Sequence, residues 1–290
     1  MKIKIGNVEA GGNTGKLIIT EYAPGATDVR TNYVDRPNGD GQMVGNDWLG
    51  SSTWAFDIST NTKNLKEAAD AVASLEGEWK KPGTRLTPNV PVPLSYSNDD
   101  GTSWYRIYGR PGKFTGMAPN VLATLGVGKV NADFVQTIPL HFEDTEQVET
   151  MAIVPPVQGG LMAPLMEPLT TIGTGLERAG FVENTGNAPT PMTIVFHGPI
   201  QNPKIRSAKG WEVGYRGTIA AGDYVTINPL LGTVKTKNGT NVAGMLTVKT
   251  RLSAVTLPVG KSEMFYTGTD TTNTATAQLK WRNAFISMQA

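Results

Sequence analysis

The sequence predicts a mainly β protein, and three observations support this. Its 290 residues include 33 glycines and 19 prolines, a density of turn residues that favours short strands over long helices. Short stretches of alternating apolar and polar residues recur, the clearest near the end, where Ala277, Leu279 and Trp281 alternate with polar neighbours. Only one segment has the spacing of an amphipathic helix. A chain of this length is expected to form about two domains.

The first domain is expected at residues 1–152 and opens with short strands at residues 2–5 and 17–20. A long polar segment, residues 25–46, follows them. Its Asp-, Asn- and Gly-rich centre has little to bury, and connections of this length are usually functional or disordered. The next predicted strands lie at residues 53–59, 92–96, 104–108 and 129–141, the middle two forming a hairpin around the turn residues 98–101.

One helix is predicted after the polar segment. Asn64 is expected to cap its N-terminus, with Glu67 three residues later as in a capping box. Proline and glycine at positions 82 and 83 end it. Its apolar residues recur at three- and four-residue steps and should cover a sheet: Leu65, Ala68, Ala69, Val72, Leu75 and Trp79.

The second domain is expected at residues 153–290. Prolines and glycines cluster at residues 155–160, which marks the boundary. Beyond it the sequence shows no helical pattern. Short strands are predicted instead, and their one-sided alternation is typical of an antiparallel sandwich. They lie near residues 193–196, 211–215, 224–228, 233–236, 264–266 and 277–282.

Composition argues against several functions. With 26 basic and 25 acidic residues, no arginine-rich run or other basic stretch stands out in the sequence, so nucleic-acid binding has no electrostatic support, and no apolar run is long enough to span a membrane. There are no cysteines and only two histidines, His141 and His197, so a three-histidine or cysteine metal site is not expected. No Gly-x-Ser-x-Gly elbow is present. We therefore expect no catalytic residues, no metal and no cofactor.

Three features together resemble the distal tail proteins of siphophages, the hub components of long non-contractile tails. The first is the ending of the N-terminal half at residues 132–142, Ala-Asp-Phe-Val-Gln-Thr-Ile-Pro-Leu-His-Phe. The second is the linker with Pro155, Pro156, Gly159 and Gly160. The third is the turn, strand and turn at residues 184–203, followed by residues 222–228.

This resemblance implies a tail-tube-like N-terminal β-sandwich with a flanking helix and a galectin- or jelly-roll-like C-terminal β-sandwich. It also implies a non-enzymatic virion protein at the tail tip, made in the host cytoplasm. Such a protein forms a hexameric ring and contacts the tail tube protein, a tail-tip spike or lysin-bearing protein, and the tape-measure protein. A ring subunit needs an exposed edge or a long arm to reach its neighbour, and residues 25–48 are expected to be that arm, with the candidate residues Asp28, Arg30, Tyr33, Arg36, Asp40 and Trp48.

Two alternatives remain open. In the first, the protein is a carbohydrate-binding or receptor-binding module whose second-domain aromatics Trp211, Tyr215 and Tyr224 stack on glycan. In the second, it is a glycan-cleaving tail enzyme whose paired carboxylates meet only in the fold.

Overall fold

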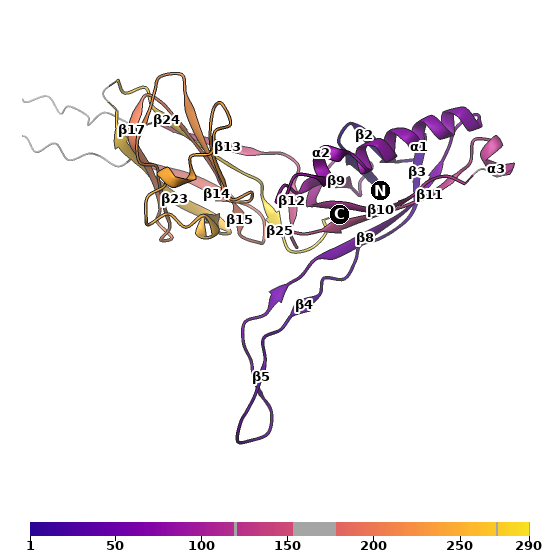
Figure 1. Ribbon diagram of the computed structural model, residues 1–290, viewed down its shortest axis with the longest axis horizontal. Helices are drawn as coiled ribbons and strands as arrows, with labels where there is room; N and C mark the ends of the chain where they lie inside the picture. Colours follow the sequence, from indigo (N-terminus) through magenta and orange to yellow (C-terminus); the bar gives the residue numbers. More distant parts are fainter. Residues whose placement is uncertain (119–120, 153–177, 271, 290) are drawn as a thin grey trace, which may run out of the picture. The chain divides into compact units, whose positions relative to one another are not determined.

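The computed structural model describes residues 1–118, 121–152, 178–270 and 272–289, and it is mainly β, as predicted (Figure 1). These residues form two compact units. Unit 1 comprises Met1–Thr145 and Phe285–Ala290, and unit 2 comprises Glu146–Ala284. The proline- and glycine-rich boundary expected at residues 155–160 lies outside the described residues. Residues 147–152, placed in the first domain by the sequence analysis, form a strand of unit 2.

Unit 1 is built on one antiparallel sheet whose neighbouring strands run in the order β2-β1-β9-β10-β11-β8-β3, with β12 beside β10 and β25 beside β12. The predicted hairpin at residues 98–101 is confirmed, because β9 pairs with β10. The strands are β1 (Lys2–Ile5), β2 (Val8–Gly11), β3 (Leu17–Ala23), β8 (Ser52–Thr60), β9 (Val92–Ser97), β10 (Tyr105–Thr115), β11 (Lys129–Gln136), β12 (His141–Glu143) and β25 (Ala284–Phe285).

The predicted helix is confirmed as α1 (Leu65–Trp79); α2 (Pro82–Arg85) and α3 (Val121–Thr124) are single turns. The Asn64 side chain accepts a hydrogen bond from the Glu67 backbone N–H at 3.0 Å, so the predicted cap forms. The Glu67 carboxylate lies 3.5 Å from the Lys63 backbone nitrogen, so the second half of the capping box is displaced by one residue.

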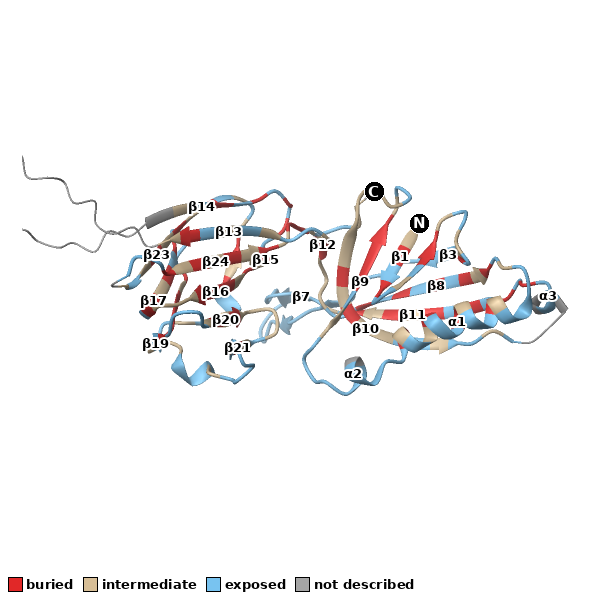
Figure 2. Ribbon diagram, turned by 90° about the horizontal axis from the view of Figure 1, so that it is seen from above, coloured by how far each residue is buried: buried red, intermediate tan, exposed pale blue. Residues whose placement is uncertain are grey.

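The core of unit 1 lies between α1 and the sheet. Trp79, at the end of α1, is 1% exposed, and its ring meets Phe56 of β8 and Phe134 of β11 at centroid distances of 6.5 and 6.3 Å. Trp54, Phe56 and Ile58 are all buried and share one face of β8, as their alternation predicts. Figure 2 shows the buried residues along the strands of this sheet, and the outer side of α1 as mainly exposed or intermediate.

The predicted strand at residues 129–141 is too long, because β11 ends at Gln136. The Gln136 side-chain amide donates to the carbonyl oxygens of Ile138 and Leu140, at 2.8 and 3.1 Å, and this holds a turn. Pro139, between them, has no N–H to continue a ladder.

The end of the chain completes unit 1. Phe285 packs edge-on against Tyr105, with ring centroids 5.8 Å apart, and Asn98 donates to the Gln289 carbonyl oxygen at 2.7 Å. The buried Tyr96 hydroxyl lies 2.8 Å from His141 Nδ1. Burial lowers the pKa of His141 to about 4, so this imidazole is neutral near pH 7.

Unit 2 contains two five-stranded antiparallel sheets, and the predicted C-terminal β-sandwich is confirmed. The first has the order β13-β24-β16-β20-β21, and the second has β14-β23-β17-β18 with β19 beside β17. Their strands are β13 (Gln147–Ala152), β14 (Arg178–Asn184), β16 (Thr193–His197), β17 (Ile200–Ser207), β18 (Glu212–Gly214), β19 (Thr218–Ile219), β20 (Tyr224–Asn228), β21 (Thr233–Thr236), β23 (Gly260–Thr269) and β24 (Thr276–Trp281).

The core of unit 2 lies between these sheets. Alternate residues of β24 are buried, as predicted: Ala277, Leu279 and Trp281. Phe196 of one sheet stacks on Tyr266 of the other, with ring centroids 6.0 Å apart. A two-stranded ladder of β15 (Thr190–Pro191) and β22 (Thr256–Leu257) and the short 3-10 turns η1 (Ala243–Met245) and η2 (Leu252–Ala254) complete the unit.

Candidate functional site: an exposed hairpin arm

A long β-hairpin projects from the sheet of unit 1 (Figure 1). We call residues 26–49 the arm. Within it, β4 (Val29–Arg30) pairs with β7 (Trp48–Leu49), and β5 (Val34–Asp35) pairs with β6 (Gln42–Met43). The sequence analysis expected a long polar loop at residues 25–46, and the structure shows a β-ribbon there instead.

The arm continues the hairpin formed by β3 and β8. Ala23 pairs with Ala55 at its root, and Arg30 pairs with Trp48 further out, with the same number of residues between these pairs on both strands. Nearer the tip, where Val34 pairs with Met43, the returning strand has one extra residue, a bulge. A ribbon rooted in a packed sheet holds the tip away from the body of the unit.

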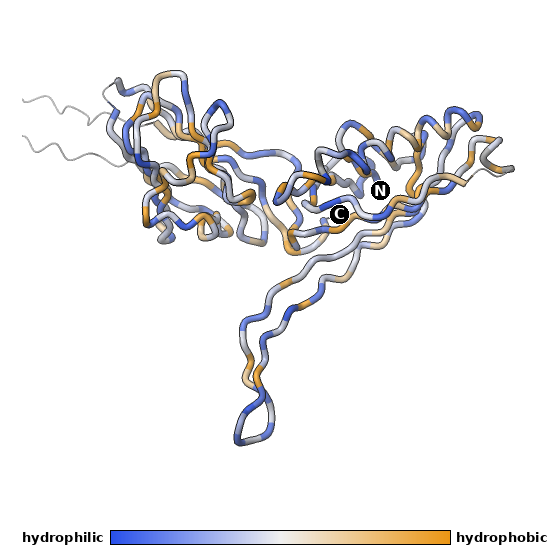
Figure 3. The backbone as a smooth tube through the Cα atoms, viewed as in Figure 1, coloured by the Kyte–Doolittle hydropathy of each residue, from blue (hydrophilic) through white to orange (hydrophobic). Residues whose placement is uncertain are grey.

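The arm has no core of its own. Every residue from 26 to 49 is exposed, and each of its ladders has only two strands. An isolated two-stranded ribbon is marginally stable in water, and its outer edges carry unpaired backbone groups. Apolar residues nevertheless occur along it, and Figure 3 marks them as orange stretches of the ribbon. The large ones, with their exposed fractions, are Val29 54%, Tyr33 43%, Val34 59%, Met43 53%, Val44 76%, Trp48 53% and Leu49 48%.

Local hydrogen bonds shape the arm. The Tyr33 hydroxyl donates to an Asp47 carboxylate oxygen at 2.9 Å, and this bond raises the pKa of Tyr33 above its usual value. The Gln42 side chain donates to Asp35 at 2.8 Å across the β5–β6 pair. At the root, the Gly50 N–H donates to the Asp28 carbonyl oxygen at 2.6 Å. The ribbon is therefore bonded at its root, middle and tip.

Two glycines allow the strands of the ribbon to approach closely. A Cβ added at Gly45 would lie 2.1 Å from the Asn32 carbonyl oxygen, and one added at Gly25 would lie 2.2 Å from the Thr53 carbonyl oxygen. Gly39, at the tip, differs because a Cβ added there would have no other atom within 4 Å. Any larger residue at position 25 or 45 therefore forces the backbone apart.

The six candidate arm residues all lie on this hairpin. Arg30 and Trp48 form a cross-strand pair, and Tyr33 is bonded to Asp47 as described. Asp28 stands at the root, and Arg36 and Asp40 flank the tip, where the Arg36 N–H donates to the Gly41 carbonyl oxygen at 3.2 Å. Their contact with another subunit stays a prediction.

The three candidate glycan-stacking residues lie at two separate cavities of unit 2. Tyr215 and Tyr224 line a small cavity of about 240 Å³. Trp211 lines a different cavity of about 820 Å³. Trp211 and Tyr215 are each only 8% exposed and belong to the core of the sandwich, so little of either ring faces solvent. Tyr224 is half-buried, 5.6 Å from the His197 ring.

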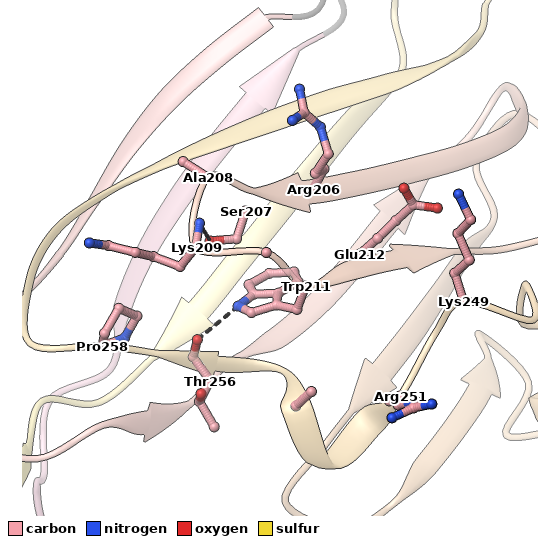
Figure 4. A pocket seen from close by; sticks show the side chains of 12 residues that line it. Arg206, Ser207, Ala208, Lys209, Trp211, Glu212, Lys249, Arg251, Thr256 and Pro258 are labelled. Atoms are coloured by element: carbon pink, nitrogen blue, oxygen red, sulfur yellow. Dashed lines mark hydrogen bonds between the residues drawn. The ribbon is translucent and has the colours of Figure 1, made fainter.

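The larger cavity is lined by cationic residues that the sequence analysis did not single out (Figure 4). Arg206 and Lys209 come from the end of β17 and the turn after it, and Lys249 and Arg251 from the segment before η2. The sequence signal was available, since each pair is closely spaced and one pair precedes Trp211. A nearly neutral chain gave no reason to expect the two pairs to meet.

Within the described parts of the chain, no group of three or more His, Cys, Asp or Glu side chains is placed to hold a metal ion. Among the same residues, no helix has the length and apolar character needed to cross a membrane.

No protein-family model and no curated protein sequence matches the chain. Solved structures do. The Dit protein of phage SPP1, described as a paradigm of the hub adsorption apparatus in phages that infect Gram-positive bacteria, aligns over 98% of both chains with a TM-score of 0.61 and 13% identity. A chain of the phage P2 baseplate in its activated conformation with Ca aligns over 96% of both chains, with a TM-score of 0.55 and 11% identity. The same baseplate with Sr gives a TM-score of 0.54 and 12% identity. The resemblance to phage distal tail proteins is therefore confirmed at the level of the fold.

Proposed function

We propose that this chain is a structural subunit of a ring-shaped hub at the distal end of a long non-contractile phage tail. The fold shared with phage Dit and baseplate proteins supports this assignment. The observation that carries it is the arm, a ribbon with seven large exposed apolar side chains and two free edges. Such a ribbon gains stability when another chain covers it.

In this proposal the arm of each subunit docks on the next subunit around a ring. The arm is one patch and its receiving surface is another, so the contact is heterologous, and heterologous contacts close into a ring when the rotation between subunits permits. Six subunits are proposed by analogy with distal tail proteins. The two faces of the ring then meet the tail tube protein on one side and the spike or lysin-bearing protein on the other, with the tape-measure protein as a further partner. The subunits do no chemistry.

An arm-shortened variant tests this proposal. Replacing residues 29–49 by a two-residue Asn-Gly turn joins Asp28 to Gly50, whose backbone groups already bond across the hairpin. Because the removed residues are all exposed on the subunit, the variant should keep its fold, as its circular dichroism spectrum should show. Sedimentation should give about six times the 31.0 kDa subunit mass for the full chain and one subunit for the variant. Equal masses for both would contradict the role given to the arm.

A further inference from the structure

We propose that the larger cavity of unit 2, which we call the basic cavity, binds a saccharide unit that carries an anionic group, a phosphate or a carboxylate. The inference does not depend on the ring, because every residue involved lies in unit 2. It replaces stacking on Trp211 by charge recognition as the mode of glycan binding.

The basic cavity has the size of a small-molecule site. Its volume is about 820 Å³, within the range of ligand pockets of roughly 300–1,000 Å³. The turn after β17 forms one wall and residues 249–258 form the opposite wall, with Trp211 between them (Figure 4). A cavity of this volume accommodates one or two sugar rings.

Positive charge dominates the basic cavity. Four cationic residues line it, Arg206, Lys209, Lys249 and Arg251, against one carboxylate, Glu212. That carboxylate already has a cationic partner outside the lining, since Lys204 Nζ lies 3.6 Å from it. The whole chain has a net charge of only +1, so this concentration of cations is a local feature. The concave wall focuses the field of these cations on a bound anion.

Three of the cations are available to a ligand. In the described part of the chain, no salt bridge involves Lys209, Lys249 or Arg251. The guanidinium of Arg206 differs, because it lies over the Phe265 ring at 4.5 Å and is thereby held in place. Arg206 is thus a fixed charge at the edge, and the others are free to close on an anion.

The walls that carry these cations are fixed by hydrogen bonds. In the first wall, the Ser207 N–H donates to the Trp211 carbonyl oxygen at 2.9 Å, and the Ser207 hydroxyl accepts from the Lys209 N–H at 3.1 Å. Behind the second wall, the Thr250 hydroxyl accepts from the Gly214 N–H at 3.0 Å. Pre-organised walls lower the entropy lost when a ligand binds.

Trp211 supplies an apolar floor. Its indole N–H donates to the Thr256 carbonyl oxygen at 2.9 Å, so the ring is locked and has no donor left for a ligand. With 8% of the residue exposed, it offers an edge rather than a stacking face. Beside it are the Ser207 and Thr256 side chains and the apolar ring of Pro258. Charge and a small apolar surface together suit an anionic sugar better than a bare inorganic ion.

Titration by two-dimensional NMR of the full-length chain tests the proposal, with the Trp211 indole N–H as the reporter. The probes are glucose 6-phosphate, glucuronic acid, neutral glucose and inorganic phosphate, all at one ionic strength. We expect saturable shifts with glucose 6-phosphate, with glucuronic acid or with both, and at least about tenfold weaker binding of glucose and of phosphate. The sugar that binds more tightly shows whether the cavity prefers a phosphate or a carboxylate group. The proposal would be overturned if neither anionic sugar gave a saturable shift. It would also be overturned if glucose, or inorganic phosphate, bound as tightly as the anionic sugars.

Matched variants locate the binding. Replacing Lys209 and Arg251 by glutamine should weaken binding of the anionic sugar about tenfold or more, because two charge-assisted contacts are lost. Lys261→Gln combined with Lys235→Gln removes the same charge elsewhere in unit 2 and should leave binding unchanged. Equal weakening in both double variants would overturn the site. The arm-shortened variant should bind the anionic sugar as tightly as the full chain does. A failure of the sugar-binding proposal can therefore be told apart from a failure of the ring proposal.

Discussion

Truncating Trp48 to alanine tests the proposal that the arm drives assembly. Trp48 is 53% exposed on the subunit. A fully buried aromatic side chain removes about 150–250 Å² from water. Covering the exposed half of Trp48 therefore removes about 100 Å², which at about 25 cal/mol per Å² contributes about 2.5 kcal/mol to each contact between subunits. We expect Trp48→Ala to weaken this association roughly sixty-fold.

The assay is sedimentation velocity over a concentration series, which gives the association constant for each variant. Phe181→Ala is the matched control, because Phe181 is an aromatic residue of unit 2 that is 65% exposed. Neither substitution should change the circular dichroism spectrum of the folded subunit, since both side chains are largely exposed on it. The reasoning is refuted if Trp48→Ala associates as tightly as the unaltered chain, or if Phe181→Ala weakens association equally.

Three further predictions concern stability and arm geometry. Asn64→Ala removes the cap of α1 and should lower the free energy of unfolding by about 1 kcal/mol in urea titrations, whereas Asn64→Asp keeps a capping oxygen and should cost little. His141 has a folded pKa of about 4, below its unfolded value of about 6.5, so the unaltered chain should lose up to ~3 kcal/mol as the pH falls through that window. In His141→Asn this loss should disappear from the pH dependence of unfolding, and an unchanged slope would count against the assignment. Gly45→Ala should separate the arm strands and reduce assembly in the sedimentation assay, and Gly39→Ala should not; equal behaviour would argue against a close approach at Gly45.

The elements that the sequence predicts well are those with one buried face. The stripe of α1 and the alternation of β8 and β24 follow from burial, and burial against a core leaves a periodic pattern in the sequence. The position of Asn64 fixes the start of α1, since the cap is a local interaction. The end of β11 was missed because a side chain, Gln136, closes the following turn.

The arm escapes such reasoning because nothing in it is buried. Its strands of two residues each carry no pattern of burial, and its composition is that of a loop. Its lower half keeps the register of β3 and β8 as far as the Arg30–Trp48 pair, and this register is a property of the paired strands and not of residues 26–49 alone.

The basic cavity could not be predicted from the sequence, because its residues are brought together only by the fold. Arg206 and Arg251 lie far apart along the chain and meet only because the turn after β17 faces the segment before η2. The sequence pattern favours the aromatic residues as the glycan site, yet Trp211 and Tyr215 belong to the core of the sandwich. Residue type indicates which chemistry is available, and burial decides whether a ligand can reach it.

A photo-crosslinking measurement tests most directly the claim that the arm contacts a neighbouring subunit. The chain has no cysteine, so Val44→Cys, at a position 76% exposed on the arm, accepts a single benzophenone label. Labelled chains are mixed with ¹⁵N-enriched chains, irradiated, digested and analysed by mass spectrometry, with Val248→Cys of unit 2 as the control. We predict crosslinked peptides that join the arm of one chain to unit 1 of another. Crosslinks confined to single chains, or equal yields from both labelled positions, would contradict the account.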